Sequence, residues 1–91
     1  MIDSDAPFST IESAHEFLSL LGETMDQARK EVALEVSACA VRQQERQLEA
    51  WQLVLYTTTK LASNVAASRR LLNDLRTLRN LLHRQRRESG G

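Results

Sequence analysis

Few side chains in this sequence could act as a nucleophile, as a general base near neutral pH, or as a nitrogen or sulfur ligand. Besides the carboxylates, they are His15, Cys39 and His83. His15 follows Glu12 by three residues, a step that places both side chains on one helix face and occurs in di-iron carboxylate bundles. Such a site needs a second step of this kind, but Asn80 stands three residues before His83. We therefore expect no metal, no other cofactor and no catalytic residue, and we interpret Cys39 as a small apolar residue of a helix seam.

The arginines suggest a different chemistry. Residues 69–87 contain seven arginines and a single acid, Asp74, and an accessible row of this kind attracts the phosphates of nucleic acid. The candidate phosphate-binding residues are Arg76, Arg79, Arg84, Arg86 and Arg87. Against this interpretation, the formal net charge is zero, with 12 basic and 12 acidic residues, and no aromatic residue after Tyr56 could stack on a base. Nucleic-acid binding is therefore the alternative function.

Charge is distributed unevenly along the chain. Up to Glu45 there are nine acidic and three basic residues, and after it there are nine basic and three acidic ones. If the chain reverses near residues 42–47, the arginine-rich segment 69–87 lies beside the acidic segment 3–26, so the asymmetry needs no ligand. An exposed ion pair contributes only about 0–1 kcal/mol, so these charges set orientation and register more than stability.

Glycine and proline are scarce, and this decides the fold class. Between residues 8 and 89 the chain has one glycine, Gly22, and no proline, so it lacks the tight turns of an antiparallel sheet. The sequence predicts an all-α fold of two long helices that form an antiparallel helical hairpin. No run approaches the ~18–20 apolar residues that cross a bilayer, and Asp3 and Asp5 stand where a secretory signal has basic residues. We expect a cytoplasmic protein without a membrane span.

The first helix is expected at about residues 9–41, after a flexible polar lead at 1–8. Ser9 and Glu12 have the spacing of a capping box, in which each side chain bonds to the backbone of the other residue. This pair predicts that the helix begins near Ser9.

An apolar series runs along this helix in steps of three and four, with Glu35 out of phase and Val36 compensating. Its members are Ile11, Ala14, Leu18, Leu21, Met25, Ala28, Val32 and Cys39. The series passes through Gly22 without a change of phase, so we expect one continuous or bent helix. The alternative is a break at Gly22, with Thr24 and Gln27 capping a new helix.

The reversal is expected at about residues 42–47, a stretch without apolar residues. This stretch contains no glycine, proline or asparagine, so hydrophobicity alone places the reversal. A second helix is expected at about 48–87, followed by a disordered tail at 88–91. A reversal near residue 44 also places His15 opposite about position 73, about 15 Å of helix away from His83.

The second helix has an apolar series of its own at its start. The members are Leu48, Trp51, Leu55, Thr58, Ala62 and Val65. Continued unchanged, this register turns Arg69, Arg76 and Arg79 toward the first helix. We therefore expect the stripe to shift through a three-residue insertion in the heptad, with a bend at 63–68. The shifted stripe is Ser68, Leu72, Leu75 and Leu82.

Further leucines flank both series and widen the apolar arc beyond what two helices can cover. They are Leu20, Leu34, Leu53, Leu61, Leu71, Leu78 and Leu81. We expect a homodimer of hairpins that forms a four-helix bundle, and a helical protein partner is the variant that the sequence leaves open. The residues expected at the interface are Leu18, Leu21, Met25, Val32, Leu48, Trp51, Leu55, Leu72, Leu75 and Leu82. The leading interpretation is a non-enzymatic protein-interaction or scaffolding module that acts as an oligomer, with no small-molecule substrate.

Overall fold

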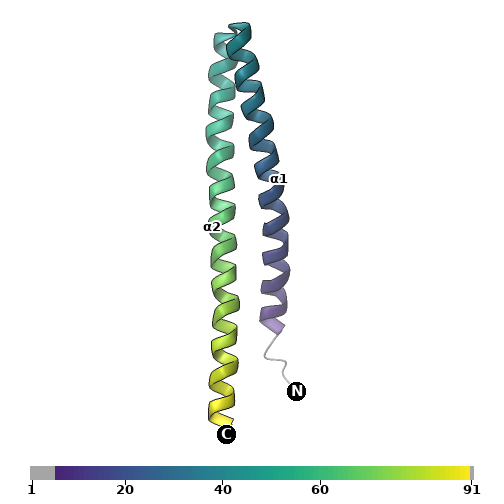
Figure 1. Cartoon of the computed structure of the whole chain (residues 1–91), viewed down its shortest axis with the longest axis vertical. Coiled ribbons are helices and arrows are strands. Elements are labelled where there is room, and N and C mark those ends of the chain that lie inside the picture. The colour runs from purple at the N-terminus through teal and green to yellow at the C-terminus, as the bar shows by residue number, and fades with distance from the viewer. Residues whose placement is uncertain (1–5, 91) are drawn as a thin grey trace.

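The computed structural model describes residues 6–90, and the side chains of residues 6–85, as two helices joined by a tight reversal (Figure 1). α1 spans Ala6–Arg42 and α2 spans Glu45–Gly90. The helices run antiparallel, side by side, and the molecule measures 72 × 20 × 14 Å. The described part of the chain contains no strand. The predicted all-α antiparallel hairpin is therefore confirmed.

α1 begins at Ala6, three residues earlier than the capping-box pattern predicted. Ser9 lies inside the helix, where its carbonyl oxygen accepts a hydrogen bond from Ser13 Oγ (3.3 Å). Pro7 stands in the first turn, where its missing N–H removes no helical hydrogen bond and its fixed φ suits the helix. The lead expected at 1–8 is thus helical from its sixth residue, and its first five residues lie outside the described part.

The reversal needs only Gln43 and Gln44, fewer residues than the six expected. Gln43 has a φ of 58°, the left-handed conformation that usually belongs to glycine at a helix end. Its N–H donates to the carbonyl oxygen of Ala40 (3.3 Å), and the N–H of Gln44 donates to that of Cys39 (3.1 Å). These two bonds are the Schellman pattern, which satisfies the last carbonyls of α1. The carbonyl oxygen of Gln44 then accepts the first bond of α2 from Leu48 N–H (2.8 Å).

The apolar series of α1 lies against α2, as predicted. Its members are half-buried or buried, and Val36 is half-buried while Glu35 is exposed, so Val36 does compensate for Glu35. The buried residues of the described part are Cys39 and Val65. α1 runs through Gly22 without interruption, which agrees with the expected single helix.

The predicted shift of the α2 stripe is wrong. Arg76 and Arg79 are half-buried against α1, whereas Ser68, Leu75 and Leu82 are exposed. Of the positions that follow Val65 in the unshifted register, Leu72, Arg76 and Arg79 are half-buried and Arg69 is exposed. α2 is unbroken helix through the expected bend.

Two contacts with α1 explain why arginines occupy seam positions in this half. Arg76 reaches the carboxylate of Glu12, and the guanidinium of Arg79 lies over the ring of Phe8, with 6.0 Å between Cζ and the ring centroid. An arginine buries its aliphatic stem while its planar head pairs with a carboxylate or stacks on an aromatic ring.

α2 continues to Gly90, so the tail expected to be disordered at 88–91 is helical over 88–90, and Gly91 lies outside the described part. Backbone hydrogen bonds extend a helix until a residue stops it, and glycine is the usual residue at such an end. α2 has 46 residues and α1 has 37, and Figure 1 shows α2 extending beyond the start of α1.

Candidate interaction faces

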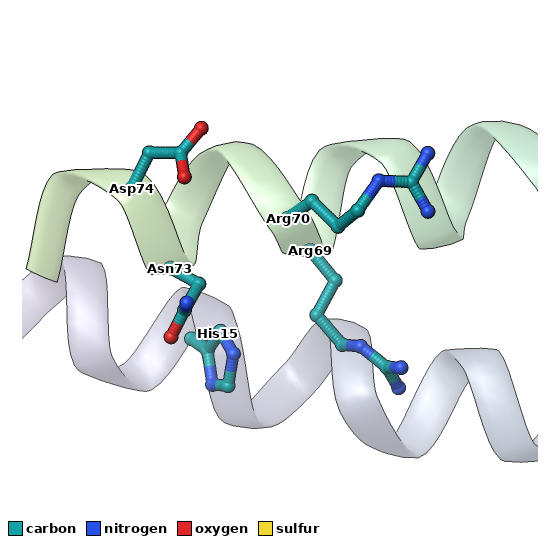
Figure 2. Close-up of a pocket in the computed structure, with 5 residues that line it drawn as sticks. All are labelled: His15, Arg69, Arg70, Asn73 and Asp74. Atoms are coloured by element: carbon teal, nitrogen blue, oxygen red, sulfur yellow. The ribbon is translucent and has the colours of Figure 1, made fainter. Parts of the chain in front are cut away.

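The two long flanks of the hairpin differ in chemistry, and the polar flank is the first candidate site. Figure 2 shows a groove on this flank near the open end of the hairpin, with side chains from both helices. Its lining residues are His15, Arg69, Arg70, Asn73 and Asp74. An adjoining groove is lined by Glu12, Asn73, Arg76, Thr77, Arg79 and Asn80. His15 lies beside Asn73, so the predicted register of the hairpin is confirmed.

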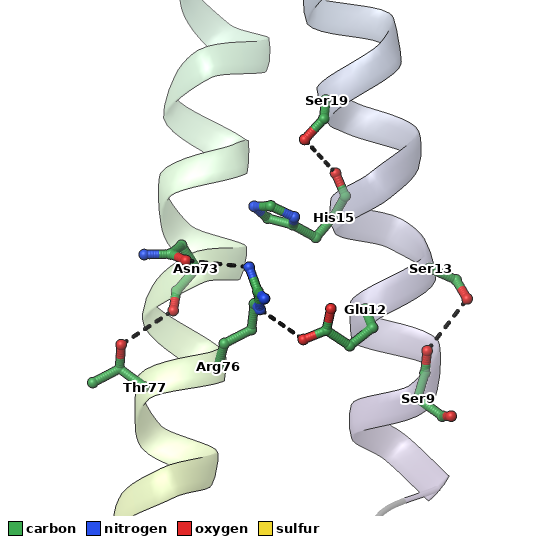
Figure 3. A network of polar contacts seen from close by, with 8 residues as sticks. All are labelled: Ser9, Glu12, Ser13, His15, Ser19, Asn73, Arg76 and Thr77. Carbon is green, nitrogen blue, oxygen red and sulfur yellow. Dashed lines mark hydrogen bonds and ion pairs between the residues drawn. The ribbon is translucent and has the colours of Figure 1, made fainter.

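An ion pair crosses this flank. Arg76 Nε lies 2.6 Å from Glu12 Oε1, and Arg76 Nη1 donates a weaker hydrogen bond to Asn73 Oδ1 (3.5 Å; Figure 3). Among residues 6–85 it is the one ion pair between the helices. Within residues 6–85, the expectation that opposite charges meet along the hairpin is therefore met at one pair.

Asp26 instead pairs with bases of its own helix. Its carboxylate accepts a hydrogen bond from Arg29 (2.9 Å) and pairs with Lys30 (3.4 Å). The Arg29 hydrogen bond, followed by the contact with Lys30, lowers the pKa of Asp26 below its usual value of 3.8.

Glu12 and His15, the two residues whose spacing occurs in di-iron carboxylate bundles, both lie on this flank. The carboxylate of Glu12 forms its ion pair with Arg76. The backbone carbonyl oxygen of His15 accepts a hydrogen bond from the Ser19 hydroxyl (3.0 Å; Figure 3). Over the described residues, no group of three or more His, Cys, Asp or Glu side chains could hold a metal ion.

The opposite flank is apolar because α2 carries a second stripe at heptad spacing. Leu71, Leu75, Leu78 and Leu82 follow one another in steps of four, three and four, and their exposed fractions are 65%, 37%, 50% and 53%. Leu61 and Val54 continue the stripe toward the reversal and are also exposed. At 3.6 residues per turn, the stripe lies roughly 100° around α2 from the side that packs on α1.

α1 contributes smaller and partly sheltered side chains to the same flank. Ala14, Leu21 and Ala28 are half-buried at the edge of the seam, and Phe17 beside them is 64% exposed. The side chains of the polar grooves lie roughly 100° around each helix axis from the packed side, in the opposite direction. We call the apolar flank the leucine face: Ala14, Phe17, Leu21 and Ala28 of α1 with Val54, Leu61, Leu71, Leu75, Leu78 and Leu82 of α2.

The leucine face ends near the reversal in a groove with acidic edges. This groove has a volume of about 510 Å³ and is lined by Ala28, Glu31, Val32, Leu34, Glu35 and Trp51. Trp51 is half-buried in it, while Glu31 and Glu35 are exposed. The continuous apolar surface therefore belongs to the open half of the hairpin.

The residues expected at an interface fall into two groups. Eight of them are half-buried between α1 and α2 and form the core of the hairpin itself: Leu18, Leu21, Met25, Val32, Leu48, Trp51, Leu55 and Leu72. The other two, Leu75 and Leu82, belong to the outward stripe. The seven flanking leucines are all exposed, which agrees with the expectation that one hairpin does not cover them. The spacing in the sequence placed Leu75 and Leu82 in the seam and Leu71 and Leu78 among the flanking leucines, so the single stripe that the four form was not predicted.

Of the arginines proposed to bind phosphate, Arg76 and Arg79 line one groove, and each is already engaged by a residue of α1. Arg76 is paired with Glu12, Arg79 is packed on Phe8, and Arg84 is exposed. The side chains of Arg86 and Arg87 lie outside the described part of the chain.

Comparisons with protein-family models, curated proteins and solved structures give no match to this chain. Neither helix, over the residues that the structure describes, has an apolar stretch long enough to cross a membrane.

Proposed function

We propose that this chain is a non-enzymatic protein-interaction module that acts as an oligomer of helical hairpins. The observation that carries the proposal is the leucine face, where four leucines of α2 at heptad spacing lie open to solvent. Scattered exposed leucines are ordinary, but a contiguous apolar patch rimmed by polar residues marks an interaction surface. A second heptad stripe on one helix is the pattern by which helices pack into bundles of more than two.

The hydrophobic term also favours association on energetic grounds. Burying apolar surface yields roughly 25 cal/mol per Å². A hairpin with only two buried residues in its described part, Cys39 and Val65, has a thin core of its own. Contacts between hairpins would add the layer that a single hairpin lacks.

Sedimentation equilibrium tests the proposal. We expect a mass that is a multiple of the 10.3 kDa chain at micromolar concentration, and the double variant Leu75→Gln/Leu78→Gln is expected to shift it toward one chain. Leu53→Gln is the control, because Leu53 is also an exposed leucine of α2 (68%) but points directly away from α1, off the leucine face. A wild-type mass of 10.3 kDa at all these concentrations would remove the proposal.

Nucleic-acid binding is the second candidate, and the observation in its favour is that Arg70 and Arg84 are exposed on the polar flank. A fluorescence-anisotropy titration against DNA and RNA at two salt concentrations separates the two functions. Binding that weakens steeply with salt, and that the triple variant Arg84→Ala/Arg86→Ala/Arg87→Ala abolishes, would favour this second candidate.

A further inference from the structure

We infer that the occupant of the leucine face is a second copy of this chain, packed face to face and antiparallel, with α2 over α2 and α1 over α1. This inference rests on the proposed function and specifies its partner and geometry. The two-fold axis lies beside residues 70–75 of α2.

The positions of apolar residues along the hairpin place the axis. At 1.5 Å per residue, the stripe from Leu61 to Leu82 lies about 25–55 Å from the reversal, with its centre about 40 Å away. Phe17 of α1 lies at the same level, about 40 Å from the reversal. A two-fold axis at this level therefore brings leucine onto leucine along α2 and Phe17 near its own copy along α1, so the face is complementary to itself.

A parallel dimer is less favourable because it packs apolar side chains of one copy against polar side chains of the other. With both reversals at one end, each α2 lies over the α1 of the other copy, and Leu78 and Leu82 face the first turns of that helix, where Thr10 and Ser13 are exposed. Glu31 and Glu35 would then be covered by the α2 of the other copy, and burying a carboxylate without a partner is costly.

The antiparallel arrangement leaves these two acids in water. Glu31 and Glu35 lie about 12–18 Å from the reversal, and the axis carries them to about 62–68 Å along the second copy. The α1 of that copy begins at Ala6, about 55 Å from its own reversal. The two carboxylates therefore lie past the end of the opposing helix.

The size of the face suits a dimer. Its apolar part is about 30 Å long and two helices, or about 20 Å, wide, which gives roughly 600 Å² in projection. The accessible surface of a corrugated helical face exceeds its projection, and a stable interface buries about 800 Å² on each partner. In such a dimer both polar flanks, with Arg70 and the groove beside His15, stay on the outside.

Distances between spin labels test the geometry. In a Cys39→Ala background, which removes the sole native thiol, a nitroxide is attached to Thr57→Cys or to Asp74→Cys; both positions are exposed. In the antiparallel dimer the two Thr57 labels are about 45 Å apart, against under about 20 Å in the parallel one. The Asp74 labels lie near the axis and are within about 20 Å of each other in the antiparallel dimer, whereas in the parallel one they point outward from diagonally opposed helices and are about 25 Å or more apart.

The outcomes separate the inference from the function on which it rests. Close Asp74 labels with distant Thr57 labels support the antiparallel dimer. Close labels at both positions, or a dimer by sedimentation with distant Asp74 labels, overturn the inference and leave oligomerisation intact. A 10.3 kDa mass with no dipolar coupling at either position overturns both. Circular dichroism of each labelled protein verifies that it keeps the helical content of the wild type.

Discussion

Replacing Gly22 with alanine is expected to stabilise the hairpin. Gly22 lies in the middle of α1, where glycine is about 0.8–1.0 kcal/mol less favourable than alanine. A Cβ built at this position would lie 3.6 Å from Arg69 Nη1 and 3.7 Å from Val65 Cγ1, which are ordinary van der Waals distances. The new methyl group therefore brings no strain, and its partial burial against Val65 adds to the gain, up to about 0.8 kcal/mol for full burial.

The gain for Gly22→Ala is thus about 1–1.5 kcal/mol. For a domain of this size, 1 kcal/mol raises Tm by about 4–8 °C. Thermal and urea unfolding followed by circular dichroism measure the change, at one fixed protein concentration because the stability of an oligomer depends on concentration. Ala33→Gly is the reverse substitution at another half-buried position of α1 and is expected to lower stability by about 1 kcal/mol.

Destabilisation by Gly22→Ala, with Ala33→Gly behaving as expected, would refute the reasoning. It would mean that α2 approaches α1 at Gly22 more closely than the distances to Arg69 and Val65 allow, so that a Cβ has no room. Loss of stability would then come from displaced packing and would exceed the propensity gain.

Three further predictions concern the reversal and the charges. Gln43→Gly is expected to raise the free energy of unfolding by about 1 kcal/mol in urea, because Gln43 occupies the left-handed region at φ 58°; an unchanged value would show that the reversal is not under this strain. A double-mutant cycle on Glu12 and Arg76 is expected to give a coupling below about 1 kcal/mol that shrinks with added salt, since both side chains are partly exposed; a larger, salt-insensitive coupling would contradict this. The Arg29 hydrogen bond lowers the folded-state pKa of Asp26 below 3.8, so its contribution to stability is present above the unfolded-state pKa and disappears as the pH falls through the folded one; NMR titration of the carboxylate carbon measures the shift, and a value at or above 3.8 would disprove it.

The features that the sequence predicted correctly are those that depend on local periodicity. Apolar residues at steps of three and four predicted both helices and the replacement of Glu35 by Val36 in the seam. The position of the reversal predicted that His15 lies beside Asn73. These features depend on the helical repeat and on the length of the chain between two residues, and both are readable from spacing alone.

The features that the sequence did not predict depend on contacts between distant residues or on the backbone. Arg76 and Arg79 turn toward α1 because Glu12 and Phe8 receive them, and no local pattern around either arginine reports a partner on the other helix. The reversal lies within the predicted residues 42–47, but the left-handed conformation of Gln43 was not predicted, because a left-handed residue other than glycine has no compositional signal.

The leucine face follows from how the phase of α2 is set. Near the reversal, the apolar side chains of Leu48, Trp51 and Leu55 pack on α1 and fix the rotation of α2 about its axis. Because α2 is one unbroken helix, this phase carries through to the open half without adjustment. In the open half, this phase turns Arg76 and Arg79 toward α1 and turns the leucines of the outward stripe away from α1. Leucines turned toward α1 would bury more apolar area. In an isolated hairpin these outward leucines therefore stay exposed to water. They become buried only when another surface covers the outward stripe. The burial of those leucines is therefore the contribution that we propose a second copy of the chain makes.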